Sequence, residues 1–410
     1  MIDSSCVMIR DRQAPAWLNQ RARLEANVSM LDFTIAICTY NGEARLPAVL
    51  RCLQACYDYR SPDGCPSPRW GVLIVDNNSS DRTAAIVAQF QADPDYPVPL
   101  HYCQEPRQGL AFARQRAMER ATSDWVAFVD DDNLPQPDWV WEAYHFAQAH
   151  PQVGAFGGRI LPAFETAPPA NFAQIACFLS INGLGDRPRT SFLYSRTSRM
   201  LPPGAGLVVR RQAWLACVPR ELVLRGRIGS WQLASEDLEA ILHIQNHGWE
   251  IWHNAAMQLD HQIPPQRLER AYLLKIVRGV GLARHRLRMV RLRPWQRPFF
   301  VALHLVNDLQ KALRFYYHHH QHLDTDTAPR VTWPFCSAAS SAPCSCGGPW
   351  PGRSAPSNLA RSALIPRPLL PSRAKGSRQR EMNPRNFRHY SRRKISVSSR
   401  SGLRGVFTQP

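Results

Sequence analysis

Apolar residues along the first 262 positions follow two alternating patterns. Short runs rich in β-branched and aromatic residues predict buried strands at 33–38, 72–75, 100–103 and 125–129. The segments between and after them have helical spacing or many helix formers, which predicts helices at 44–57, 83–91, 109–121 and 139–149. Because strands alternate with helices, the pattern is typical of an α/β fold with a doubly wound, mostly parallel, Rossmann-like sheet.

Polar residues directly follow three of these strands, at 39–43, 76–81 and 130–132. In a parallel sheet the carboxyl ends of the strands meet at one edge, and ligands of open α/β sheets bind there. We therefore expect the three polar clusters to lie together and to form a ligand site.

The third cluster consists of consecutive carboxylates, Asp130, Asp131 and Asp132, at the end of an apolar run. Unpaired carboxylates at the end of a buried strand repel one another and are poorly solvated. A hard cation such as Mg²⁺ or Mn²⁺ would neutralise them, and Mg²⁺ is usually held by one or two carboxylates plus substrate phosphates. The cluster therefore indicates either a metal and nucleotide-diphosphate site or a solvated acidic turn.

Glycines mark the next part of the chain. A glycine-rich strand is predicted at 153–160, followed by a loop-rich region at 161–200 that suits a variable, substrate-facing excursion. Gly204 and Gly206 then precede a short strand at 207–209. Two glycines one residue apart allow either a close approach of the backbone to a ligand or a tight turn into the strand.

An acidic helix start and a histidine provide further candidates. The helix predicted over 234–245 has Ser235 as a natural N-cap and acids, including Glu236 and Asp237, in its first turn. The helix dipole alone favours acids at this position, so capping and catalysis both remain possible roles. His261 follows the next predicted strand, and its interest as a ligand comes from the metal candidate already present, because a lone histidine is more often structural.

Residues 268–317 are expected to be helical and basic. Cations alternate there with Leu, Ile, Val and Met, at positions Arg270, Lys275, Arg278, Arg284, Arg286, Arg288, Arg291 and Arg293. Such a segment either lies on an anionic membrane surface, with its apolar face in the interface, or packs on the domain with a solvated basic face.

The net charge of the chain does not alter this interpretation. The formal charge of +18 is typical of a nucleic-acid binder, but 15 Lys and Arg against 3 Asp and Glu lie in residues 321–410. This Pro-, Ser-, Arg- and Gly-rich tail is expected to be disordered, and residues 1–30 to be a polar leader. No secretory signal and no uncharged apolar run of about 18 residues is present. The 11 cysteines form no CxxC pair, which favours a reducing cytosol.

Five segments in order, FTIAICTYNGE, VLIVDNNSSD, WVAFVDDDN, the Gly-Ala-Gly turn and SEDLE, resemble the inverting family 2 glycosyltransferases of the GT-A fold. The similarity spans about residues 31–262. GWEIW and HQIPPQRLERAYLLKIVRGVGL further resemble a cyanobacterial subgroup associated with hormogonium polysaccharide. The resemblance implies a GT-A domain over 31–262, a basic helical extension over 263–320, and a tail without counterpart.

The resemblance also implies roles for individual residues. The nucleotide-sugar donor would contact Thr39, Tyr40, Glu43, Asp76, Asp130 and Asp131, with Asp131 mainly holding its loop. Asp132 and His261 would hold Mn²⁺ or Mg²⁺. Asp237, in its pair with Glu236, would be the catalytic base.

The implied activity is metal-assisted transfer of a sugar, from a UDP-sugar or related donor, to a polysaccharide or lipid-linked glycan acceptor. It would take place in the cytoplasm, at the inner face of the plasma membrane, in exopolysaccharide synthesis. No Gln-x-x-Arg-Trp motif of processive synthases is present, which favours single transfers. One alternative is a nucleotidyltransferase, although TYNGEARL lacks the glycine-rich GxGxR-type loop. Another is a basic protein that binds membrane surfaces or nucleic acid, although no specific nucleic-acid partner is expected.

Overall fold

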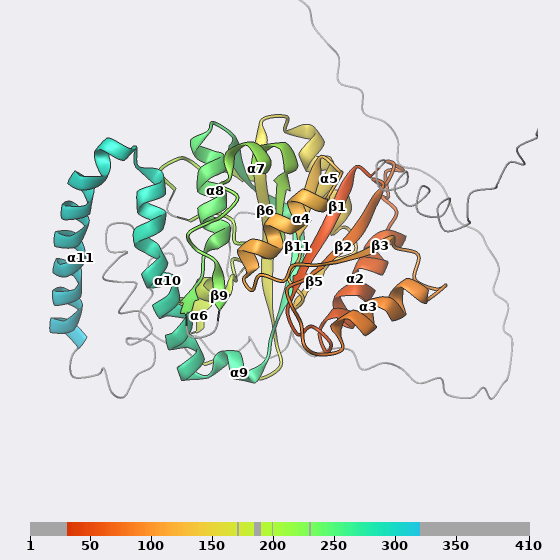
Figure 1. Cartoon of the computed structure of the whole chain (residues 1–410), viewed down its shortest axis with the longest axis horizontal. Helices are drawn as coiled ribbons and strands as arrows, with labels where there is room; N and C mark the ends of the chain where they lie inside the picture. The colour runs from red at the N-terminus through yellow and green to blue at the C-terminus, as the bar shows by residue number, and fades with distance from the viewer. Residues whose placement is uncertain (1–30, 170–171, 184–189, 199, 229–230, 320–410) are drawn as a thin grey trace, which may run out of the picture. The chain divides into compact units, whose positions relative to one another are not determined.

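The computed structural model describes residues 31–169, 172–183, 190–198, 200–228 and 231–319. They form a nine-stranded sheet in the order β3-β2-β1-β4-β8-β6-β11-β5, with β7 paired to β11 (Figure 1). The strand pairings orient β1, β2, β3, β4, β6 and β11 in one direction, and β5, β7 and β8 in the other. The predicted α/β fold with a mostly parallel sheet is confirmed.

The first half of the chain contains the predicted strands and helices. They are β1 (Phe33–Thr39), α2 (Leu46–Asp58), β2 (Trp70–Asp76), α3 (Thr83–Ala92), β3 (Leu100–Gln104), α4 (Leu110–Arg120), β4 (Trp125–Phe128) and α5 (Trp139–Ala149). Strands β1, β2 and β4 are mostly apolar and buried almost throughout, because helices cover both faces of the sheet. In the parallel register Thr39 lies opposite Asp76, so the polar residues after β1 and β2 are adjacent.

The second half contains elements that the sequence pattern does not predict. Its elements are β5 (Asn133–Pro135), β6 (Val153–Phe164), α6 (Phe172–Ile175), η1 (Ala176–Leu179), β7 (Phe192–Leu193), β8 (Leu207–Arg210), α7 (Arg211–Cys217), β9 (Gly226–Ile228), β10 (Trp231–Leu233), α8 (Glu236–Asn246) and β11 (Glu250–Ile263). The strand predicted at 153–160 continues to Phe164 because β11 pairs with it along its length. The predicted loop region after it contains α6, η1 and β7 between irregular segments.

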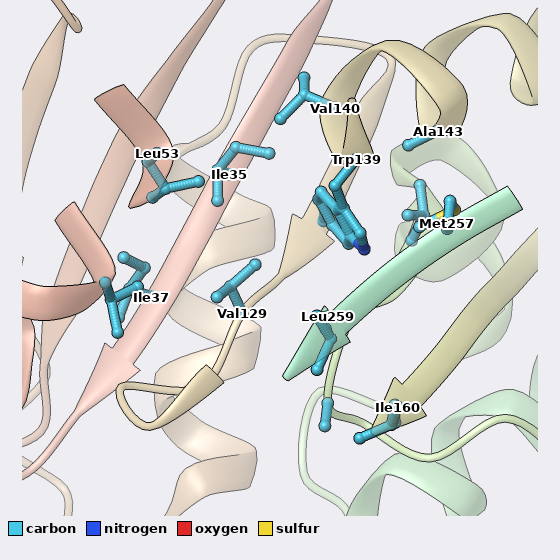
Figure 2. Packing of buried hydrophobic residues seen from close by; sticks show 14 of the residues in the cluster. Ile35, Ile37, Leu53, Val129, Trp139, Val140, Ala143, Ile160, Met257 and Leu259 are labelled. Atoms are coloured by element: carbon cyan, nitrogen blue, oxygen red, sulfur yellow. The ribbon is translucent and has the colours of Figure 1, made fainter. Parts of the chain in front are cut away.

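Two apolar clusters fill the two faces of the sheet. Helices α2 and α5 contribute side chains to one cluster, and helices α4, α7 and α8 contribute to the other. Trp139 at the start of α5 is fully buried in the first cluster, where Figure 2 shows it among Val129, Met257 and Leu259. Burial of apolar surface is the main favourable term in folding. This packing fixes the chain after β4 relative to β11, and the two carry the acidic cluster and His261.

The C-terminal part of the described chain is helical, as the sequence predicts. It contains α9 (Pro265–Leu268), α10 (Arg270–Arg291), η2 (Pro294–Gln296) and α11 (Arg297–His319). Pro294 separates the two long helices because proline disfavours helical conformation in the residue before it. None of the described helices is long and apolar enough to cross a membrane. The predicted leader at 1–30 and tail at 321–410 lie outside the described residues.

Candidate active site

Hydrogen bonds join the loops that follow β1 and β2. Asn41 N donates to Ser79 Oγ at 2.9 Å, and Asn41 Oδ1 accepts from Ser80 N at 2.9 Å. Glu43 Oε2 accepts from Arg82 N at 3.1 Å, so the Glu43 carboxylate contacts the second loop. The two loops therefore form one polar surface at the carboxyl ends of neighbouring strands.

Gly42 gives this surface its tight geometry. Its N–H donates to Thr83 Oγ1 at 2.8 Å. A Cβ at this position would lie 2.1 Å from Thr39 Oγ1, which is far inside van der Waals contact. The close packing of the two loops therefore requires glycine here.

Asp76 is buried at the end of β2, with both carboxylate oxygens hydrogen-bonded. Oδ1 accepts from Ser79 N at 2.8 Å, and Oδ2 accepts from the Tyr102 hydroxyl at 2.6 Å. Burial, together with the hydrogen bond to Asp76, raises the pKa of Tyr102 to about 12. Tyr102 on β3 therefore keeps its proton and fixes the orientation of the Asp76 carboxylate.

Asp131 connects the acidic cluster to the loop after β1. Thr39 Oγ1 donates to Asp131 Oδ2 at 2.6 Å, and Arg45 Nε and Nη2 donate to its two oxygens at 2.9 and 2.8 Å. Arg45 also donates to the carbonyl oxygen of Tyr40, whose ring is half exposed. A bidentate arginine pair fixes a carboxylate in both position and angle, so these contacts hold the Asp131 carboxylate against the loop after β1.

Asp132 and His261 lie together, with Arg267 between them. The antiparallel register of β5 and β11 places His261 opposite Asn133, next to Asp132. His261 Nε2 is 3.7 Å from Asp132 Oδ2; Arg267 on α9 donates to that oxygen and contacts Nε2 at 2.7 Å. Burial alone would raise the pKa of Asp132, but His261 and Arg267 outweigh it and lower the pKa.

The chemistry of this pair fits a divalent cation. His261 Nδ1 lies 3.0 Å from the carbonyl oxygen of Leu179, so the ring proton belongs on Nδ1 and the lone pair of Nε2 accepts from Arg267 Nη1. In the structure the guanidinium of Arg267 supplies the positive charge between Asp132 and His261. Among the described residues no group of three or more His, Cys, Asp or Glu could hold a metal, so further ligands would come from the substrate or water.

A buried arginine on α4 links the acidic cluster to the start of α8. Arg114 Nη1 donates to Glu236 Oε1 at 3.0 Å, and Nη2 lies 3.6 Å from Asp130 Oδ1. Burial would lower the pKa of Arg114, but Glu236, Asp130 and Asp237 outweigh it and raise the pKa. Burial also raises the pKa of Asp130, against the opposing charge of Arg114. The three side chains thus form an ion cluster in which Arg114 and Glu236 are buried and Asp130 is partly exposed.

Asp237 is partly exposed, and backbone N–H groups hold both of its carboxylate oxygens. Its Oδ2 accepts from Gly204 N at 2.5 Å, and its Oδ1 accepts from Leu238 N at 2.8 Å. A Cβ on Gly204 would lie 2.4 Å from Arg114 Nη2, so the glycine turn approaches the ion cluster closely. Ser235 occupies the predicted N-cap position, but its side chain makes no capping hydrogen bond.

The candidate residues therefore come together in two groups. The residues after β1, β2 and β4 share one edge of the sheet, as expected from the parallel strands. Ion pairs then bring Glu236 to Asp130 through Arg114, and His261 to Asp132. Sequence reasoning missed Arg114, Arg45 and Arg267. Arg114 belongs to the buried stripe of α4 with Ala111 and Met118, and that helical spacing is a signal that could have identified it.

Comparison with known proteins agrees with this arrangement. A family model described as Glycosyl transferase family 2 matches residues 34–198. A glucosyl-dolichyl phosphate glucuronosyltransferase from Haloferax volcanii is 30% identical over 103 residues, 25% of this chain and 32% of the relative. Succinoglycan biosynthesis protein ExoM from Rhizobium meliloti is 27% identical over 138 residues, 34% of this chain and 42% of the relative. The chain thus spans less than half the length of these relatives.

A likeness of lower identity is found among solved structures. The mannosyltransferase PcManGT from Pyrobaculum calidifontis, in complex with GDP-Man and Mn²⁺, is 18% identical with a TM-score of 0.44, over 80% of this chain and 84% of that one. The mostly parallel sheet with acidic residues at its carboxyl edge defines an α/β domain of the ligand-binding type. Residues 34–198 of this domain are similar to glycosyl transferase family 2. That part includes Asp76, Asp130 and Asp132.

Proposed function

We propose that the protein is an inverting glycosyltransferase that moves a sugar from a nucleotide-diphosphate donor to a polysaccharide or lipid-linked glycan acceptor, one sugar per encounter. The family match over residues 34–198 supports the enzyme class. The names of the two curated relatives, one acting on a dolichyl phosphate and one in succinoglycan biosynthesis, support the acceptor class. A UDP-sugar is the first donor to test.

The observation that carries the proposal is the state of Asp237. Its neighbour Glu236 is buried and paired with Arg114, whereas Asp237 is partly exposed and held by the Gly204 N–H at 2.5 Å. A general base must reach its substrate and keep a fixed orientation. Asp237 therefore serves as the base, and Glu236 as the residue that positions it through Arg114 and the start of α8.

The donor would bind along the joined loops after β1 and β2. Thr39, Tyr40 and Glu43 border the site on one side, and Asp76 borders it on the other. Asp76 is oriented by Tyr102 and Ser79, yet each carboxylate oxygen can accept a further hydrogen bond from a base or ribose. Asp130, which is partly exposed, lies on the side toward Arg114 and is assigned to the ribose and donor sugar.

Asp132 and His261 would hold Mn²⁺ or Mg²⁺, because Asp132 Oδ2 and His261 Nε2 lie 3.7 Å apart and a proton on Nδ1 leaves the Nε2 lone pair for a cation in place of Arg267. Once bound, such an ion neutralises the diphosphate and makes it a better leaving group. Arg267 then gives up its contacts with both residues, and its guanidinium becomes available to other anions in the site.

The chemical step is a single displacement. Asp237 accepts the proton of an acceptor hydroxyl as its oxygen forms a bond to the anomeric carbon, on the face opposite the diphosphate. The bond between the anomeric carbon and the diphosphate oxygen breaks, and the nucleoside diphosphate leaves with the electron pair. Because attack comes from the opposite face, the configuration at the anomeric carbon inverts.

A donor screen tests this function directly. The full chain is incubated with UDP-, GDP- and dTDP-sugars and Mn²⁺, and release of nucleoside diphosphate is measured for the wild type and for Asp237→Asn. We expect release from one donor class and its loss in the variant. The anomeric coupling constant of a transferred sugar, measured by NMR, distinguishes inversion from retention. A parallel incubation with nucleoside triphosphates and a sugar 1-phosphate tests the alternative: formation of a nucleotide sugar with release of pyrophosphate, without nucleoside diphosphate release from any donor, would identify a nucleotidyltransferase and overturn the proposal.

A further inference from the structure

Helix α11 presents an apolar face that the described part of the chain leaves exposed. Its exposed side chains include Phe299, Leu303, Leu305, Val306, Leu309 and Leu313, each between 51 and 71% exposed. Their spacing of one to four residues spreads them over one broad side of the helix. Scattered exposed apolar residues are ordinary, but a contiguous patch of this kind marks an interaction surface.

The opposite side of α11 packs against α10 (Figure 1). Asp308 accepts from Arg288 Nη1 and Nη2 at 2.6 and 3.0 Å, and Arg284 lies 3.7 Å from it. Lys311, a cation of the same helix, is buried. The acid of α11 is therefore turned inward and neutralised, which leaves its outward face apolar.

A basic groove of about 420 Å³ runs between the two helices beside this face. Arg278, Arg284 and Arg288 of α10 line it, together with the exposed side chains Leu282 and Leu305. Asp308 is the acid in its lining. Apolar and cationic groups thus share one surface, and the segment 263–319 carries 12 Lys and Arg against 2 Asp and Glu.

The basic residues of α10 contribute unequally to this surface. Several of those residues have partners inside the protein. Arg286 pairs with the buried Glu239 at 2.8 Å, and Arg291 donates to the carbonyl oxygens of residues 196 and 198, both at 2.7 Å. The apolar contribution comes from α11 instead, and the exposed cations beside it include Arg278 and Arg314.

We propose that the exposed face of α11 and the groove between α10 and α11 form a docking surface for an anionic phospholipid bilayer. The leucines enter the boundary between head groups and acyl chains, and the exposed cations Arg278 and Arg314 contact lipid phosphates. Charge selects this occupant. A second copy of the same surface would bring like charges together, and residues 321–410, with 15 Lys and Arg against 3 Asp and Glu, are also basic. The proposal does not depend on the catalytic assignment.

Vesicle flotation with the full-length protein tests the docking surface without any donor. Vesicles of phosphatidylcholine alone are compared with vesicles that contain about one-third phosphatidylglycerol. We expect flotation with the anionic vesicles that weakens as NaCl rises from about 0.1 to 0.5 M. Leu305→Glu with Leu309→Glu should lower the partition coefficient at least about tenfold, because both side chains are about two-thirds exposed and would leave the interface.

Two further variants separate surface docking from general effects. Leu215→Glu makes the same change at an exposed position on α7 and should float like the wild type. Arg278→Gln should lower binding to anionic vesicles about fivefold and leave binding to neutral vesicles unchanged.

Wild-type protein that stays unbound overturns the proposal, and so does equal loss in Leu215→Glu. Light scattering that shows a dimer, converted to a monomer by Leu305→Glu with Leu309→Glu, would assign this face to a second copy. Nucleotide release in solution by the same variants reports separately on the catalytic site.

Discussion

The two halves of the candidate site are held by different kinds of interaction. After β1 and β2, backbone N–H groups and neutral side chains fix the loops, as in the contacts of Asn41 with Ser79 and Ser80. Around Asp130, Asp132 and Glu236, arginines from α4 and α9 do so. The first half is held mainly by hydrogen bonds from backbone N–H groups, and the second depends on cations that neutralise a cluster of acids.

The difference means that the loops after β1 and β2 are fixed in advance, whereas the cation that neutralises an acid of the second half can be replaced by another cation. Hydrogen bonds between loops persist whether or not a donor is bound, so they can define the nucleotide position in advance. An arginine that neutralises a carboxylate can be replaced by another cation, because the carboxylate needs a positive partner rather than a particular one. The Arg267 side chain is about one-quarter exposed and can undergo such exchange, whereas Arg114 is buried.

The largest effect is expected for Asp237→Asn. Loss of the base should lower kcat by roughly two to four orders of magnitude, while donor affinity stays near that of the wild type, because the amide keeps the shape but accepts no proton. Steady-state transfer kinetics and calorimetric titration of the donor measure the two quantities. Asp63→Asn, an exposed change away from the site, is the matched control. A fully active Asp237→Asn enzyme would remove Asp237 from the mechanism.

A large stability effect is expected for Arg114→Gln. The change leaves Glu236 and Asp130 without their cation in a buried setting, which should cost about 3–5 kcal/mol in free energy of unfolding. Urea denaturation followed by circular dichroism measures it. Arg116→Gln on the same helix is the control: Arg116 is partly exposed and Glu105 keeps its second partner Arg107, so the loss should stay below about 1 kcal/mol. Equal losses of unfolding free energy in the two variants would show that Arg114 contributes no more to stability than Arg116 does.

The same contrast explains what could be predicted from the sequence. Thr39, Asp76 and the acidic cluster were placed at one edge because apolar runs end there and parallel strands share that edge. The arginine partners depend on tertiary contacts over long separations, 135 residues for Arg267 and Asp132. Arg267 follows two prolines in a segment without periodicity, so no local pattern connects it with an acid. The exposed face of α11 likewise becomes evident only when the side that packs on α10 is known.

A moderate effect is expected for Arg267→Gln. The guanidinium competes with a divalent cation for Asp132 and His261, so its removal should strengthen Mn²⁺ binding in the absence of donor at least about tenfold, since a unit charge within about 4 Å is worth a few kcal/mol near a protein surface. Electron paramagnetic resonance of free Mn²⁺ measures the affinity without any turnover. Arg270→Gln, an exposed change on the next helix, should leave it unaltered. Weaker binding in Arg267→Gln would mean that Arg267 supports the metal ligands instead of competing for them.

The smallest effect is expected for Tyr102→Phe, on the neutral side of the comparison. The raised pKa of Tyr102, about 12 against an ordinary value of 10, means that the folded protein holds this proton more tightly than the unfolded chain does. The stability that it contributes is present below pH 10 and is lost as the pH rises toward 12.

Wild-type protein should therefore lose more stability over this interval than Tyr102→Phe, as shown by thermal unfolding at a series of pH values. At neutral pH the variant should lose only about 0.5–1.5 kcal/mol, the usual net value of one hydrogen bond. Identical pH profiles would show that the Asp76 carboxylate is oriented by Ser79 and not by Tyr102, and the neutral half of the site would then rest on backbone contacts alone.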